Sequence, residues 1–243
     1  MDVLAIIPAR GGSKGIHLKN ITLLDGKPLI TYSIESAKKS KLISRIIVST
    51  DHKKIAEISK KSGAEVPFLR PKKISGSKAS TKDVIKHTLD FLKVEEAYIP
   101  DIVVLLQPTS PLREYNIIDK SIKKFRKEKP DIMLEVSTIK SHPFRSFLPN
   151  GKLLKPFKKN FLKYHQRQMF PKMYYPTGEL YIFWAKNIEK YGNMYGPKIG
   201  AIIKSEKEIS SDINNLFDLF VCEMRIKYWK QYQTKMEKLK KNI

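Results

Sequence analysis

Cysteine, long apolar runs and internal repeats are scarce or missing in this 243-residue sequence. The single cysteine, Cys222, excludes an intramolecular disulfide, so we expect a reducing compartment, the cytoplasm. No run of eighteen apolar residues occurs and the first residues lack a secretory-signal pattern, so we expect neither export nor a membrane span. Outside a basic run over 235–241, no repeat or low-complexity segment is found, which excludes a repeat architecture.

Acidic residues are also few, because 24 Asp and Glu stand against 47 Lys and Arg, giving a formal charge of +23. A charge of this size can indicate nucleic-acid binding. The basic residues are spread along the chain, however, and many fall on the polar faces of expected helices. We interpret most of them as solvated surface, with an acidic small-molecule substrate as a second contributor, and do not expect a nucleic-acid partner.

Apolar runs alternate with helical patterns along most of the chain. We expect strands over 3–7, 45–50, 65–69, 101–107, 131–136, 178–184 and 199–203. We expect helices over 28–39, 53–61, 84–92, 114–127 and 215–240. The alternation predicts one α/β domain over 1–243 with a mostly parallel sheet. At 137–176, frequent prolines and aromatic residues, with a turn at Asn150-Gly151, predict an inserted hairpin whose aromatic side chains face a partner.

The most informative stretch is 3–20, in which an expected strand, Val3–Ile7, leads into a loop rich in glycine and positive charge. The polar and small residues of the loop are Ala9, Arg10, Gly11, Gly12, Ser13, Lys14, Gly15, Lys19 and Asn20. Glycine lets backbone N–H groups approach an anion closely, and the cations add charge within side-chain reach. The loop therefore predicts a phosphate site, with a mobile surface turn carrying solvated lysines as the alternative.

Two well-known phosphate loops do not fit this stretch. The order Ser13-Lys14-Gly15 matches neither the Walker spacing nor Gly-x-Gly-x-x-Gly. The next expected helix starts only at Pro28, so 16–27 must continue past the ligand before a helix begins. A loop that wraps in this way favours a triphosphate over a pyrophosphate bridge.

Three more loops are expected near the same edge of the sheet, beyond the carboxyl ends of the strands. Ligands of open α/β sheets bind at this edge. Loop 70–80 offers a guanidinium and hydroxyls, and loop 107–113 offers an amide, hydroxyls and a second guanidinium. Loop 210–218 offers the carboxylates of Asp212 and Asp218. A nucleoside triphosphate with Mg²⁺ needs this combination, since Mg²⁺ takes only one or two carboxylates from the protein.

Two stretches resemble the signatures of the acylneuraminate cytidylyltransferases, or CMP-sialic acid synthetases. They are Ile7-Pro-Ala-Arg-Gly-Gly-Ser-Lys-Gly15, followed by Lys19-Asn20, and Leu105-Leu-Gln-Pro-Thr-Ser-Pro-Leu-Arg113. Shorter matches at 70–71, 79–80, 167–168, 176–178 and 212–213 extend the similarity over nearly the whole chain. The resemblance implies a Rossmann-like three-layer α/β/α nucleotidyltransferase that transfers CMP from CTP to the anomeric hydroxyl of a nonulosonic acid, a nine-carbon 2-keto sugar acid. It also implies pyrophosphate release with Mg²⁺, and a homodimer in which 137–176 reaches the partner's site.

The same resemblance implies a role for each site residue. Arg10, Lys19 and Asp212 are expected to be catalytic, and Asp212 with Asn214 is expected to bind the metal. The nucleotide is expected to contact Ala9, Arg10, Gly11, Gly12, Ser13, Lys14, Asn20, Arg70 and Ser80. The sugar is expected to contact Gln107, Thr109, Ser110, Arg167, Tyr175, Thr177, Gly178 and Glu179. Without the resemblance, Ser80 is equally well explained as a helix N-cap, Gln107 as a strand-end amide and Arg113 as a salt-bridged residue.

Several positions depart from the family pattern. Asn214 stands where a second metal carboxylate is usual, so we expect weaker but not abolished metal binding. Tyr175 and Glu179 replace the usual residues on the sugar side, which favours a relative of sialic acid such as legionaminate or pseudaminate. A 3-deoxy-octulosonate substrate, another nucleobase, and a catalytically weak CTP-binding or assembly protein stay open as alternatives.

Overall fold

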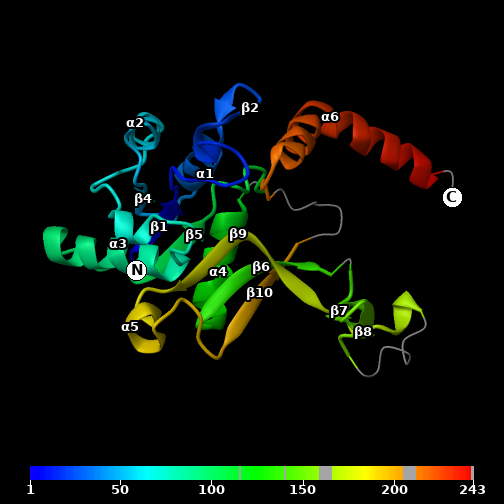
Figure 1. Ribbon diagram of the computed structural model, residues 1–243. Helices are drawn as coiled ribbons and strands as arrows, with labels where there is room; N and C mark the ends of the chain where they lie inside the picture. Colours follow the sequence, from blue (N-terminus) through cyan, green and yellow to red (C-terminus); the bar gives the residue numbers. More distant parts are fainter. Residues whose placement is uncertain (115, 140, 159–165, 205–211, 242–243) are drawn as a thin grey trace.

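The computed structural model describes residues 1–114, 116–139, 141–158, 166–204 and 212–241, apart from the side chains of 167, 230, 233 and 236–241. Within these ranges, a six-stranded sheet has the order β10-β6-β9-β5-β1-β4 (Figure 1). Its strands are β1 (Val3–Pro8), β4 (Arg45–Ser49), β5 (Ile102–Leu106), β6 (Ile132–Thr138), β9 (Tyr174–Trp184) and β10 (Ile199–Ile203). Strand β9 is antiparallel to both of its neighbours, and all other pairings are parallel. The mostly parallel sheet predicted from the sequence is therefore confirmed.

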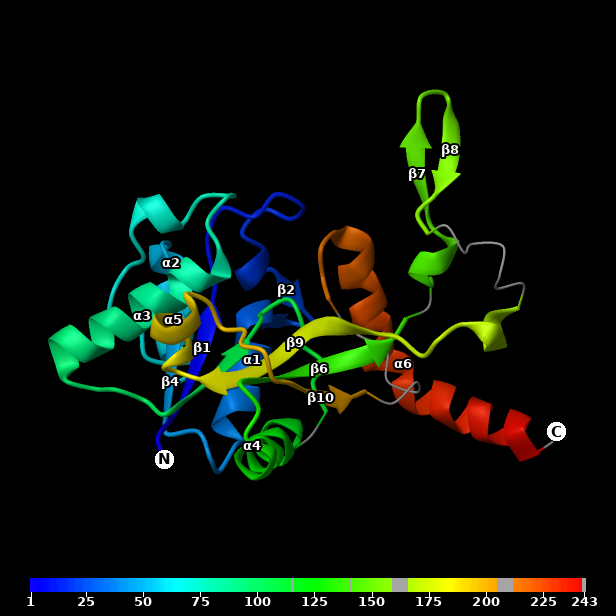
Figure 2. The same ribbon diagram turned by 90° about the horizontal axis from the view of Figure 1, so that it is seen from below.

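Helices cover both faces of the sheet. They are α1 (Leu29–Lys38), α2 (Lys53–Lys61), α3 (Thr81–Glu96), α4 (Ile117–Glu128), α5 (Asn187–Tyr191) and α6 (Leu216–Lys241). One apolar core joins α1, α2 and α4 to one face, and a second joins α3 and α5 to the other, which gives three layers (Figure 2). None of the helices in the described part of the chain has the length and apolar character that crossing a membrane requires.

The central strand β5 supplies side chains to both cores. Val104 and Leu106 lie in the core beneath α1 and α4, whereas Val103 and Leu105 lie in the core beneath α3. Every residue of β5 is buried. A strand covered on both faces has no solvent side, which explains why its sequence is a continuous apolar run instead of an alternating one.

Two short hairpins lie outside the main sheet. Strand β2 (Leu23–Leu24) pairs with β3 (Lys27–Pro28), and β7 (Phe147–Asn150) pairs with β8 (Leu153–Pro156). The second hairpin turns at Gly151, whose φ is 61°, and it projects from the body of the molecule (Figure 2). The hairpin expected at Asn150-Gly151 is thus present.

The strand expected over 65–69 is wrong. The structure has two isolated bridges there, Ile47 with Glu65 and Thr50 with Leu69. Pro67 lies between them and lacks the backbone N–H that a continuous ladder needs. Short 3₁₀ helices complete the described elements, at Lys19–Ile21, Lys72–Ile74, Pro143–Arg145 and Arg167–Met169.

Candidate functional site

The carboxyl ends of the parallel strands meet at one edge of the sheet. Strand β1 leads there into loop 9–20, β4 into Thr50 and Asp51, β5 into loop 107–113, and β10 into Lys204. The antiparallel strand β9 begins at the same edge. Because ligands of open α/β sheets collect beyond these strand ends, this edge is the candidate site.

Loop 9–20 is held against the end of β4. The Ala9 N–H donates to Ser49 O (2.9 Å), and the Gly11 N–H donates to Asp51 Oδ1 (2.8 Å). Gly11 also lies against the side chain that follows Asp51, because an added Cβ would be 3.0 Å from His52 Cβ. The loop therefore begins in a fixed position.

Two further hydrogen bonds act within the loop. The amide of the buried Asn20 donates from Nδ2 to Arg10 O (2.8 Å), and the Ser13 N–H donates to Gly11 O (3.0 Å). The N–H groups of Gly11 and Ser13 are therefore already engaged within the protein. Binding of an anion at this loop depends more on its cationic side chains than the number of glycines indicates. The exposed members of the predicted set in this loop are Gly12 and Lys14.

Ile213 connects three of the predicted loops. Lys19 Nζ donates to Ile213 O (2.7 Å), and the Ile213 N–H donates to Thr109 O (2.8 Å). Gly15 lies so close to the same segment that an added Cβ would be 2.1 Å from Asn214 O. Three loops that are distant in the sequence are thus packed together.

Lys19 is the partly buried cation at this junction. Burial lowers the pKa of its ammonium group, the charge of Arg10 lowers it further, and Asp212 and Asp218 oppose the shift. Arg10 Nη1 also donates to Gly76 O (2.9 Å), which joins loop 9–20 to the loop before α3. A partly desolvated cation interacts more strongly with an anion than a fully hydrated one does.

The acidic part of the site lies at the start of α6. Asp212 Oδ2 accepts a hydrogen bond from Asn214 Nδ2 (2.9 Å). Asp218 Oδ2 accepts from the Asn215 N–H (3.1 Å), and Asn215 Oδ1 accepts from the Asp218 N–H (3.0 Å), which is a capping box. Asp218 is therefore engaged in starting the helix, whereas Asp212 is exposed.

This donor set fits a limited metal-binding role. Within the described ranges, no group of three or more His, Cys, Asp or Glu side chains is placed to hold a metal. Mg²⁺ normally takes one or two protein carboxylates and completes its shell with water and phosphate oxygens. The Asp212 carboxylate and the Asn214 amide oxygen have the chemistry for that role, and metal binding itself stays a prediction.

Arg70 and Ser80 are held by the fold. Arg70 is buried and donates from Nε to Ser49 Oγ (3.1 Å) and from Nη2 to Ser49 O. Burial lowers the pKa of its guanidinium to about 10, and Asp51 opposes the shift. Ser80 is the N-cap of α3, where its Oγ accepts from the Asp83 N–H (3.1 Å). Contacts of these two residues with a nucleotide stay predictions.

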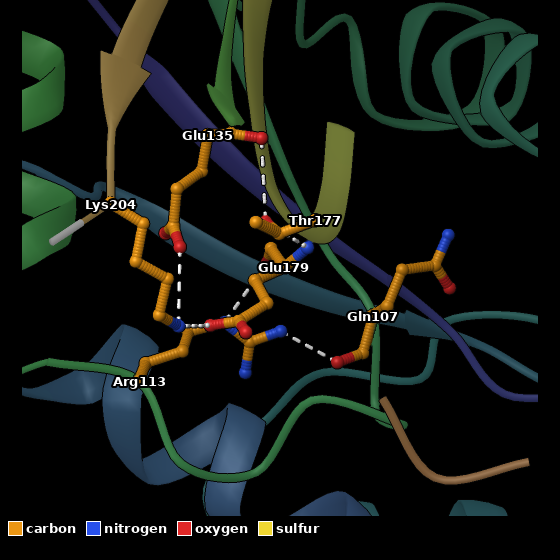
Figure 3. Close-up of polar contacts among 6 residues, drawn as sticks. All are labelled: Gln107, Arg113, Glu135, Thr177, Glu179 and Lys204. Carbon is orange, nitrogen blue, oxygen red and sulfur yellow. Dashed lines mark hydrogen bonds and ion pairs between the residues drawn. The ribbon is translucent and has the colours of Figure 1, made fainter. Parts of the chain in front are cut away.

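Arg113 fixes loop 107–113 from beneath (Figure 3). It donates from Nη2 to Gln107 O (2.6 Å), from Nη1 to Ser33 Oγ (2.8 Å) and from Nε to Glu179 O (3.0 Å). Burial lowers the pKa of Arg113 to about 10, and the carboxylates of Glu179 and Glu135 oppose the shift. The side-chain amide of Gln107 points away from these contacts in Figure 3, so it is not used by them.

Strand β9 is irregular beside this loop. Its register with β6 shifts at Glu135, and Gly178 has a φ of 82°. Thr177 Oγ1 donates to Glu135 O (3.3 Å), and both Thr177 and Glu179 are buried. An irregularity of this kind re-aims side chains, and here Glu179 is directed into the protein.

Two charged residues outside the predicted set complete this region, Glu135 and Lys204. Lys204 Nζ lies 2.7 Å from Glu179 Oε2 and 3.3 Å from Glu135 Oε1, and all three residues are buried (Figure 3). Burial raises the pKa of Glu135, Glu179 adds to this shift, and Lys204 opposes it. The signal in the sequence was a lone charge within or directly after an apolar strand, which usually has a buried partner.

The remaining residues that the sequence predicts for the sugar lie along the same edge. Thr109 is partly buried, Ser110 is buried and Tyr175 is exposed. The side chain of Arg167 lies outside the described residues. Glu179 is bound to Lys204 in the interior, which argues against its predicted direct contact with a sugar and in favour of a supporting role.

Comparison with known proteins gives consistent matches over almost the whole chain. A family model described as cytidylyltransferase matches residues 4–237. The chain is 35% identical over 227 residues to a CMP-N,N′-diacetyllegionaminic acid synthase of Legionella pneumophila, covering 92% of this chain and 95% of that protein. It is 31% identical over 220 residues to a pseudaminic acid cytidylyltransferase of Campylobacter jejuni, covering 90% and 94%. It is 33% identical over 219 residues to an N-acylneuraminate cytidylyltransferase of Escherichia coli, covering 89% and 50%.

Solved structures share the fold. A CMP:2-keto-3-deoxy-manno-octonic acid synthetase complexed with CTP has a TM-score of 0.69 at 14% identity, covering 93% of this chain and 99% of that one. A cytidylyltransferase from Leptospira borgpetersenii has a TM-score of 0.59 at 21% identity, covering 100% and 95%. These similarities confirm the Rossmann-like architecture that was expected from the sequence.

The close packing of Gly15 against Asn214 gives a testable prediction. In Gly15→Ala the new Cβ would meet a backbone oxygen at 2.1 Å, so loop 9–20 and the start of α6 must move apart. Overpacking of this kind costs about 1–3 kcal/mol, which urea denaturation should detect as a lower free energy of unfolding. Gly12→Ala is the matched control, because its Cβ would meet nothing within 4 Å. Equal stability of the two variants would contradict the observed packing.

Proposed function

The chain belongs to the cytidylyltransferase family, and on that premise we propose that it transfers CMP from CTP to the anomeric hydroxyl of a nonulosonic acid, releasing pyrophosphate. The observation that carries this proposal is the junction at Ile213, which brings Lys19 of the first loop beside Asp212. Relatives named for legionaminic, pseudaminic and N-acylneuraminic acids support the class of sugar.

The cations of loop 9–20 are the groups that we assign to the triphosphate. Arg10, Lys14 and Lys19 carry the charge, and the backbone from Ala9 to Ser13 forms the surface on which the phosphates lie. Asn20 and Arg70 keep that surface in shape, since their described hydrogen bonds go to Arg10 O and to Ser49. Ser80 anchors the start of α3 on the base and ribose side.

The proposed reaction needs positioning more than it needs a reactive side chain. The anomeric hydroxyl loses its proton to solvent as its oxygen forms a bond to the α-phosphorus, and the bond from that phosphorus to the departing pyrophosphate breaks. Fixed cations stabilise the charge on the phosphate oxygens, and the two loops hold the reactants in line. No covalent nucleophile takes part; the thiol of Cys222 is buried, which raises its pKa to about 11. This cysteine suits a reducing cytoplasm, where we place the reaction.

Asp212 and Asn214 are the residues that we assign to Mg²⁺. The ion, when bound, would supply positive charge to the phosphate oxygens. Asn214 donates its amide hydrogen to Asp212 in the structure, so the two side chains hold each other without a metal. An Asp in place of Asn214 would repel the Asp212 carboxylate, and a bound cation would then stabilise the pair more strongly.

The Asn214→Asp variant tests this assignment. A second carboxylate adds ligand charge, so the Mg²⁺ concentration for half-maximal turnover should fall, by about tenfold. Asn215→Asp is the matched control, because it makes the same change one residue later at a helix N-cap that accepts Asp equally well. An unchanged Mg²⁺ requirement in Asn214→Asp, or an equal fall in the control, would remove Asn214 from the metal site.

The sugar is assigned to the edge between β5 and β9. Gln107, Thr109 and Ser110 lie on the β5 side, and Tyr175 and Gly178 lie on the β9 side, with Thr177 buried between them. We assign the carboxylate of the sugar to Arg167. Tyr175 is the exposed member of this set that departs from the usual family residue, so it is the first candidate for setting the choice of sugar.

Pyrophosphate release is the direct test of the proposed function. Each of the four nucleoside triphosphates should be combined with N-acetylneuraminic, legionaminic, pseudaminic and 3-deoxy-octulosonic acids, with and without Mg²⁺. We expect release with CTP and at least one nonulosonic acid. Lys19→Met should lose nearly all turnover, whereas Lys86→Met, at an exposed lysine of α3, should keep it.

The other outcomes of this assay are equally informative. Release with 3-deoxy-octulosonic acid alone would replace the proposed substrate by the sugar named for the structural neighbour. Saturable CTP binding without release in any combination would favour the catalytically weak CTP-binding protein. Turnover that persists in Lys19→Met would separate the activity from the junction at Ile213.

We also propose that the β7–β8 hairpin contacts a second copy of this chain in a homodimer. Its apolar side chains are exposed, with Leu153 at 73% and Leu154 at 67%. The start of α6 adds Leu216 and Phe217, which are also exposed. Exposed apolar patches such as the one on this hairpin are typical of interaction surfaces, and a homodimer is what the family resemblance implies.

Sedimentation velocity over a range of concentrations tests the dimer. The unmodified chain should sediment as a dimer, and Leu153→Asp should shift it towards the monomer because a charge is placed in an apolar contact. Val94→Asp is the control, since Val94 is 76% exposed on α3, away from the hairpin. A monomer at every concentration, or an equal shift in both variants, would contradict this assignment.

A further inference from the structure

A cluster of four charged side chains lies beneath the edge of the sheet that we assign to the sugar. It consists of Arg113, Glu135, Glu179 and Lys204 (Figure 3). Side-chain exposure is 5% for Lys204, 4% for Glu135 and 0% for Glu179. The cluster contains two carboxylates and two cations, so its net charge is zero. Because a buried ion is costly when it is unpaired, each of these charges is stabilised by the others.

Glu179 connects two parts of the site. Its carboxylate binds Lys204 Nζ at 2.7 Å, and its main-chain oxygen accepts from Arg113 Nε at 3.0 Å. Arg113 in turn holds Gln107 O at 2.6 Å, where loop 107–113 begins. Lys204 follows β10, and its N–H donates to Val136 O at 2.8 Å. Glu179 thus sets the spacing between the exits of β5 and β10.

The backbone before Glu179 is adapted to this contact. Gly178 has a φ of 82°, a conformation that favours glycine. Thr177 Oγ1 bonds both Glu135 O and the Glu179 N–H, each at 3.3 Å. Register irregularities of this kind are over-represented at sheet edges and next to active sites. A buried ion pair adds little stability over a well-packed apolar pair, so its fixed geometry is the better explanation for its presence.

We propose that Glu179 and Lys204 are positioning residues, whose ion pair holds Gln107 and Thr177 at the spacing that the sugar requires. This inference rests on the proposed function. Both side chains are buried, so they act through their neighbours and not by contact with substrate. The nucleotide side has a second anchor at the end of β4, through Ser49, so loss of the pair should affect CTP binding less than sugar binding.

The double variant Glu179→Gln/Lys204→Met tests the inference. It removes one carboxylate and one cation, so the cluster keeps equal numbers of opposite charges, although Glu135 loses its ion pair with Lys204. We expect the KM for the sugar to rise about tenfold or more, because small misplacements of substrate-positioning groups have large effects. The KM for CTP should rise less than the KM for the sugar, and cooperative urea unfolding should show that the variant is folded. The single variant Lys204→Arg keeps the positive charge, so it should raise the KM for the sugar less than the double variant does.

Glu65→Gln is the matched control. It breaks an ion pair with Arg45 at the opposite edge of the sheet, and it should leave the KM for the sugar unchanged. The inference is overturned if the double variant binds the sugar as tightly as the unmodified enzyme, or if its KM rises equally for sugar and CTP. Failure of the proposed function would look different, because the unmodified enzyme itself would release no pyrophosphate, and the inference would then fall with it.

Discussion

Two hydrogen bonds at Ile213 determine the shape of the site. Lys19 Nζ donates to the Ile213 carbonyl, and the Ile213 N–H donates to Thr109 O. Three segments that are distant in the sequence therefore meet at one buried residue. The sheet makes this meeting possible, since the carboxyl ends of β1 and β5 lie at the same edge. Lys19, loop 107–113 and the carboxylate of Asp212 are thereby brought together at the edge where we propose that the nucleotide binds.

Burial distinguishes three cations of the site from those of the surface. The pKa values of Lys19, Arg70 and Arg113 are all lowered, mainly by burial. Arg70 and Arg113 donate to strand-end oxygens and hydroxyls, and so hold the loops in place. Their charges also add to the positive field in which a triphosphate would lie. The high net charge of the chain therefore says less about its ligand than the few cations held at this edge.

Local patterns in the sequence were sufficient for much of the fold. Strands β1 and β5 are continuous apolar runs that lead into loops with glycine, polar or charged residues, so both the strands and their loops could be predicted. The false strand at 65–69 shows the limit, because Pro67 prevents a ladder within an otherwise suitable run. Ser80 had two explanations in the sequence, and its hydrogen bond to Asp83 shows that the N-cap is one of its roles.

The charge cluster around Glu179 could not be predicted in the same way. Its pairing depends on β9 lying antiparallel between β5 and β6, and on the irregular backbone at Gly178. Neither feature follows from a local pattern, because both are set by partners distant in the sequence. The sequence therefore identified Glu179 as unusual, but only the fold shows that its carboxylate is bound to Lys204 in the interior.

A crystal structure of the protein with bound CTP tests the central claim most directly. The account predicts that the phosphates lie against loop 9–20, beside Arg10, Lys14 and Lys19. A triphosphate bound elsewhere would contradict it, for example in the hollow between α1 and the start of α4 that is lined by Tyr32, Glu35, Asn116 and Asp119.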